Sequence, residues 1–99
     1  MNLKLEDLLL LDLDDLMAMI EDRTPVQSGG TPHVLLSNWP ACPKGMWEVS
    51  IGGIAPTIRA ETRKRACAQA ILWLDENPKA GPEGFQARRM LVFREGRLV

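Results

Sequence analysis

The sequence predicts a two-layer α+β domain in the order helix, three strands, helix, followed by a C-terminal β-hairpin. Three observations predict it: leucines at helical spacing near the start, alternating side chains in the middle, and an alanine-rich helical pattern afterwards. Strands joined by short turns form an antiparallel sheet, and two amphipathic helices can cover one face of it. With 99 residues the chain can bury one core but not two, so we expect a single domain over residues 1–99.

The first predicted element is an acidic, leucine-rich helix within residues 1–22. One helical face carries the apolar residues Leu5, Leu9, Leu13, Leu16 and Ile20. Further leucines and methionines widen this face beyond what a surface helix needs. Two interpretations remain open. Either Asp12 caps a second short helix, or one helix buries two faces, the second against a partner or another copy of the chain.

Residues 33–60 are predicted to form three antiparallel strands. The first covers 33–37, and the clearest covers 46–53, because its polar and apolar side chains alternate. The third, residues 54–60, carries Pro56 near its start, which predicts a position at the edge of the sheet.

A second helix is predicted over residues 62–76, with Thr62 as its N-cap and Asn77 before a proline as its end. Residues 86–99 are predicted to form a β-hairpin around Glu95-Gly96. Both strands of this hairpin carry arginines on mixed faces, which is typical of a protected edge.

Charge is unevenly distributed along the chain, although the net charge is only −1. Residues 1–22 hold seven acids against one lysine, a balance of −6, and residues 23–99 hold eleven cations against six acids, a balance of +5. The total gives no argument for binding to nucleic acid or to a membrane surface. No apolar run matches a signal peptide or the ~20 residues of a membrane span, so we expect a cytoplasmic protein.

The residue types that carry chemistry are sparse. His33, Cys42 and Cys67 are three possible soft ligands without metal-site spacing, and no glycine-rich loop leads into a helix. Nothing indicates an orienting group or an oxyanion hole for a cysteine nucleophile. We therefore expect no catalytic residues, no metal site and no cofactor, and two reduced thiols.

The element order and the stretch "TRKRACAQAILWL" resemble the double-stranded RNA-binding domain. Thr62, Arg63 and Lys64 match that family's helix cap and first two basic residues, while Cys67 stands where the family usually has a lysine. The resemblance implies that Arg63 and Lys64 contact phosphates across the major groove of an A-form duplex. The nucleic-acid candidates on this interpretation are Arg59, Arg63, Lys64 and Arg65.

The chain is also similar to small uncharacterised alpha-beta-alpha proteins of bacteriophages and prophages. The stretches "WEVSIGG" and "TRKRACAQAILWL" carry this similarity. It implies a fold and a phage or mobile-element origin, hence the cytoplasm of a bacterial host, but no chemistry.

The function predicted from these observations is non-catalytic binding to a host protein or complex, for example to inhibit a host defence. The acidic helix would mimic nucleic acid towards a basic surface, and Trp39 would be an exposed anchor. The protein-partner candidates are Asp7, Asp14, Asp15, Asp22 and Trp39. Two alternatives stand beside it: a double-stranded RNA-binding module, and a homodimer held by the broad leucine face of the first helix.

Overall fold

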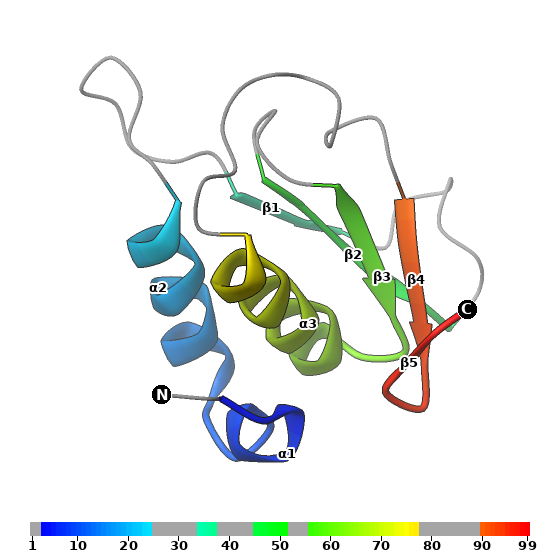
Figure 1. Ribbon diagram of the computed structural model, residues 1–99, viewed down its shortest axis with the longest axis horizontal. Coiled ribbons are helices and arrows are strands. Elements are labelled where there is room, and N and C mark those ends of the chain that lie inside the picture. The colour runs from blue at the N-terminus through cyan, green and yellow to red at the C-terminus, as the bar shows by residue number, and fades with distance from the viewer. Residues whose placement is uncertain (1–2, 25–33, 38–44, 52–55, 78–89) are drawn as a thin grey trace.

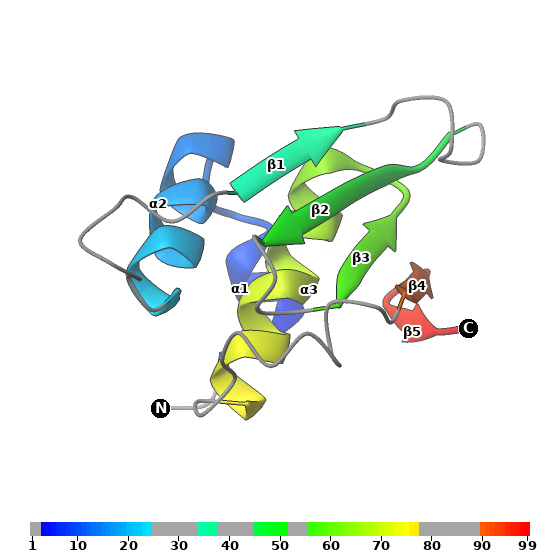
Figure 2. The ribbon, with the colours of Figure 1, turned by 90° about the horizontal axis from the view of Figure 1, so that it is seen from above.

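A computed structural model describes residues 3–24, 34–37, 45–51, 56–77 and 90–99. It has two layers, with three helices on one face of a single β-sheet (Figures 1 and 2). The helices are α1 (Leu5–Leu8), α2 (Leu13–Arg23) and α3 (Arg63–Glu76). The strands are β1 (Val34–Ser37), β2 (Trp47–Ile51), β3 (Thr57–Ala60), β4 (Met90–Arg94) and β5 (Arg97–Leu98).

The sheet differs from the predicted one. It has five strands in the order β1-β2-β3-β4-β5, and β4 pairs with β3 in parallel while the other pairs are antiparallel. The prediction of a three-stranded antiparallel sheet with a separate hairpin was therefore wrong, although the α+β class is confirmed. Helix α3 lies between β3 and β4 in sequence, and such a crossover returns the chain to the end where β3 began, so β4 runs parallel to it.

The position of β3 also differs from the prediction. β3 lies between β2 and β4 and is not an edge strand. Pro56 comes just before the first residue of β3. Because proline lacks only its own N–H, a proline ahead of the strand removes no donor from the ladder.

The N-terminal leucine-rich segment forms two helices, which decides between the two interpretations left open. Asp12 is the N-cap of α2, and its Oδ1 accepts a hydrogen bond from the Asp15 N–H at 2.9 Å. Leu9, Leu10 and Leu11 form the turn between α1 and α2. The change of direction lets Leu8 of α1 and Leu16 of α2 both reach the core.

The core lies between the helices and the sheet. Helix α3 supplies its centre, with Ala66, Cys67, Ala70 and Ile71 all without measurable exposure. The small side chains on α3 allow α2 to pack closely against it, and the two helices run in the same direction (Figure 1). At their C-terminal ends the Arg23 Nε donates to Asp75 Oδ1 at 2.6 Å.

The β4–β5 hairpin is confirmed, and its turn is defined by two residues with positive φ. Glu95 has φ 52° and Gly96 has φ 77°, as a two-residue turn of the type I′ class requires. The Glu95 N–H donates to the Glu61 Oε2 at 3.0 Å. This bond places the turn beside the junction between β3 and α3.

Candidate interaction surfaces

The outward side of α2 is acidic. Its exposed residues are Asp14, Asp15, Ala18, Glu21 and Asp22, at relative positions i, i+1, i+4, i+7 and i+8, which lie on one side of a helix. We call these five residues the acidic face. The opposite side of α2 is apolar and buries Leu16 and Ile20, so the packing of the helix leaves the carboxylates in solvent.

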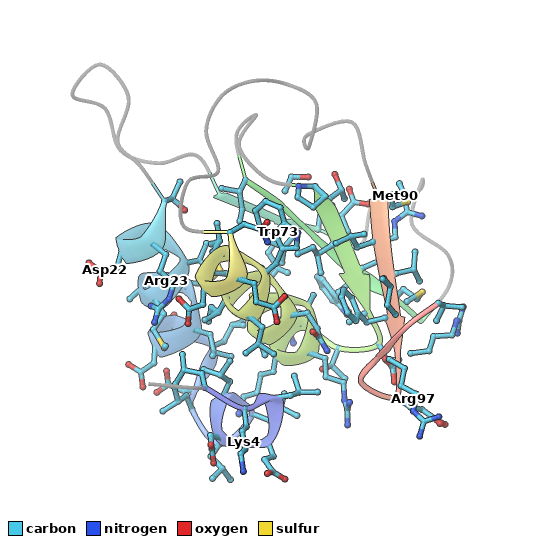
Figure 3. The ribbon with its side chains drawn as sticks, in the orientation of Figure 1. Lys4, Asp22, Arg23, Trp73, Met90 and Arg97 are labelled. Carbon is cyan, nitrogen blue, oxygen red and sulfur yellow. The ribbon has the colours of Figure 1, made fainter. Side chains whose placement is uncertain are left out.

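No carboxylate of the acidic face forms an ion pair with a residue in the described ranges. The nearest cation in sequence, Arg23, is directed to Asp75 on α3. The side chain of Asp22 points away from the rest of the molecule (Figure 3). Asp7, the remaining candidate from this segment, is exposed on α1.

Leu10 is a large apolar side chain in the turn before the acidic face, and 85% of it is exposed. Its neighbours in the two helices are mostly covered, with Leu8 and Leu16 buried and Leu9 half-buried. The predicted homodimer depended on a second broad leucine face. The two short helices bury Leu8 and Leu16 and pack the half-buried leucines of this segment against the core, and the homodimer stays a prediction.

A basic region lies at the other side of the molecule. It combines the first turn of α3 with the β4–β5 hairpin, because the bond between Glu95 and Glu61 brings the two together. We call this region the basic end, and its cations are Arg63, Lys64, Arg65, Arg94 and Arg97. Arg63, Arg94 and Arg97 are exposed, while Lys64 and Arg65 are half-buried.

Two local features organise the basic end. Thr62 caps α3, its Oγ1 accepting from the Arg65 N–H at 3.0 Å, as predicted from the sequence. The Arg63 guanidinium lies over the Trp47 ring, 4.9 Å from its centroid, which is within the range of a cation–π interaction. This contact holds the Arg63 guanidinium against Trp47 of β2.

Arg59, the fourth nucleic-acid candidate, lies apart from the other three. Its Nε donates to the Glu48 Oε1 at 3.0 Å, and the Arg59 side chain is only 11% exposed. Glu48 and Arg59 are directly opposed on β2 and β3. They alternate with the buried Val49 and Ile58, so the pair lies on the sheet face away from the helices.

The structure therefore groups the candidate residues differently from the sequence. It keeps Arg63, Lys64 and Arg65 together and adds Arg94 and Arg97, for which the sequence pattern predicts edge protection of the hairpin. The sequence pattern places Arg94 and Arg97 on the strands of the hairpin. It does not show that the turn of this hairpin lies beside the start of α3. Trp39 lies outside the described residues.

Cys67 does not resemble a reactive thiol. It is fully buried, burial raises the pKa of its thiol to about 11, and its Sγ lies 3.7 Å from the Met17 Sδ. Reactive cysteines have lowered pKa values and some exposure. Within the described ranges no group of three or more His, Cys, Asp or Glu side chains could hold a metal ion. None of the described helices is long and apolar enough to cross a membrane.

Comparison with known proteins returns no match of this chain to a protein-family model, to a curated protein or to a solved structure.

Proposed function

We propose that this protein is a non-catalytic binding protein that presents its acidic face to a basic surface of another protein. The observation that carries the proposal is the acidic face itself: four exposed carboxylates on one side of α2, with no ion pair to any described residue. Inhibition of a host assembly and a phage origin remain predictions of the sequence, because no described contact bears on them.

The placement of these charges supports a binding role over a structural one. Asp14 and Asp15 lie in the first turn of α2, where the helix dipole favours negative charge. Glu21 and Asp22 lie in the last turn, where the same dipole disfavours negative charge by about 0.3–1 kcal/mol each at exposed sites. The helix dipole therefore does not account for Glu21 and Asp22 at these positions, which favours a contact outside the molecule.

An acidic surface of this kind accelerates and selects association with a basic partner. Charge complementarity steers diffusional encounter and raises association rates, and added salt reduces this effect. The exposed Leu10 beside the carboxylates would supply apolar contact area at the edge of the same surface.

Two paired variants test the proposal against a trivial loss of stability. The first variant, Glu21→Lys with Asp22→Lys, reverses the charge of half of the acidic face at the C-terminal end of α2, where the helix dipole favours cations. The second variant, Asp14→Lys with Asp15→Lys, reverses the charge of the other half at the N-terminal end, where the dipole disfavours cations. The immobilised chain is incubated with an extract of its source cells, and captured proteins are quantified at low and high salt. Both variants should lose the salt-sensitive partner that the wild type captures.

The matched control is Glu76→Lys with Glu95→Lys, which changes the net charge equally at exposed positions outside the acidic face. It should retain the partner. If capture falls only for Asp14→Lys with Asp15→Lys, helix stability explains the loss and the acidic face is not the binding surface. If the control loses the partner as well, total charge and not this face is responsible.

Binding of double-stranded RNA is the second candidate, and the basic end favours it. The structure brings Arg94 and Arg97 beside the first turn of α3, so five cations share a region that the sequence indicated with three. A short RNA duplex should then bind at low salt, weaken steeply as salt rises, and bind poorly to Arg63→Glu with Lys64→Glu. An affinity that does not change with salt would exclude this use of the basic end.

A further inference from the structure

The acidic face and the basic end lie on opposite sides of one molecule. Asp22 of the acidic face and Arg97 of the basic end mark these two sides in Figure 3. The basic end carries five cations against the two carboxylates of Glu61 and Glu95, and the acidic face carries four carboxylates and no cation. Each surface therefore has the charge that the other would attract.

Exposed apolar side chains accompany both surfaces. In the described part of the chain, the exposed large hydrophobic residues are Leu10, Met90, Leu98 and Val99. Leu10 adjoins the acidic face, whereas Leu98 and Val99 follow Arg97 on the hairpin strand at the edge of the sheet. The basic end therefore has two adjacent exposed apolar residues beside its charges, and the acidic face has one, Leu10.

From this double complementarity we propose that the protein associates with itself head to tail, the acidic face of one molecule docking on the basic end of the next. Leu10 of the first molecule would then lie near Leu98 and Val99 of the second. The inference does not rest on the proposed function, because it needs only the purified chain.

The geometry also determines the kind of assembly. The two surfaces differ and lie on opposite sides, so each contact leaves one acidic face and one basic end free. Such a heterologous contact does not close as a symmetric dimer; it builds a ring or an open chain of molecules, depending on the rotation between successive copies. The association would also cover the acidic face, so it would compete with a foreign basic partner.

Sedimentation equilibrium of the full chain tests the inference. At about 10 mM salt, where the Debye length is about 30 Å, the average mass should rise with concentration and pass the dimer mass. At about 1 M salt, where the Debye length is about 3 Å, it should return to the monomer mass. A mass that stays monomeric at low salt, that stops at the dimer, or that ignores salt overturns the inference.

Two neutralised variants then identify the surfaces. The acidic-face variant combines Asp14→Asn, Asp15→Asn, Glu21→Gln and Asp22→Asn, and the basic-end variant combines Lys64→Gln, Arg94→Gln and Arg97→Gln. Each alone should remain monomeric at low salt, with thermal unfolding showing that it is folded. Their mixture should form a complex of one molecule of each and no larger species, because each variant keeps one working surface.

The mixture separates this inference from the proposed function. If each variant still assembles alone, or if the mixture forms no complex, the head-to-tail contact is wrong. Capture of a foreign partner by the acidic face is measured independently and would stand in either case. If the protein self-associates but captures no foreign partner through the acidic face, the proposed function is wrong and the acidic face binds a second copy of the chain.

Discussion

Raising the pH should destabilise this protein through one buried thiol, Cys67. The side chain has no measurable exposure, and burial raises the pKa of its thiol from 9.0 to about 11. Between these values the unfolded chain has released the thiol proton while the folded chain still holds it. The contribution of the protonated Cys67 thiol to stability is therefore fully present below pH 9 and is lost as the pH rises towards 11.

The size of the loss follows from the two pKa values. Ionisation of the unfolded thiol should lower the free energy of unfolding by about 1 kcal/mol between pH 8 and pH 10, and by roughly 3 kcal/mol once the pH exceeds both values. The chain contains no tyrosine, which removes the other side chain that commonly titrates near pH 10 apart from lysine.

Urea unfolding followed by tryptophan fluorescence at pH 8 and pH 10 measures the effect. Cys67→Ala is the comparison, with Cys42→Ser in both proteins so that only one thiol differs. The alanine variant should be less stable at pH 8, because it loses buried volume, but should lack the extra loss at pH 10. Equal losses in the two proteins would refute the assignment to Cys67, since lysines and the amino terminus are common to both.

Three further changes test how the elements are held together, each by urea unfolding. Asp12→Ala should lower stability by about 1 kcal/mol by removing the N-cap of α2, and Asp12→Asn should restore most of it; no change would mean that the cap is dispensable. In a double-mutant cycle, Glu48→Gln and Arg59→Met should show a coupling energy of about 0.5–3 kcal/mol, whereas additive effects would deny the ion pair a net role. Gly96→Ala should lower the free energy of unfolding by about 1–2 kcal/mol, because Gly96 has a left-handed backbone conformation. The loss should exceed that of Gly45→Ala, because a Cβ at Gly96 would lie 3.1 Å from an α1 leucine while Gly45 has open space. A larger loss for Gly45→Ala would contradict this.

Much of the local structure could be predicted from short-range patterns. Thr62 caps α3 as the sequence predicts, and Asp12 caps α2, which was one of the two interpretations that the sequence left open; both bonds join residues only three apart. Helix α3 covers Arg63–Glu76, within the predicted range, and the Glu95-Gly96 turn joins β4 and β5. In β2 the buried Val49 and Ile51 alternate with half-buried polar residues, as expected for a sheet covered on one face.

The predictions that were wrong concern contacts between segments that are distant in sequence. The fourth strand could have paired with either edge of the three-stranded sheet or with none, and its own residues do not distinguish these choices. From Pro56 the sequence predicts an edge strand, but the effect of a proline depends on whether it lies inside the ladder or just before it. The basic end likewise depends on one bond across 34 residues, between Glu95 and Glu61.

The sequence by itself determined the α+β class, the N-cap of α3, the hairpin turn and the separation of acidic from basic segments, because each follows from neighbouring residues or from counting charges. Only the tertiary structure decided which strands are adjacent, that the leucines of α1 and α2 are mostly used in the core, and that Arg59 belongs to an ion pair away from the other cations. It also decided that Arg94 and Arg97 join Arg63, Lys64 and Arg65 at one end, opposite the acidic face. The physical reason is that burial and long-range pairing depend on how the elements pack, which no local pattern specifies.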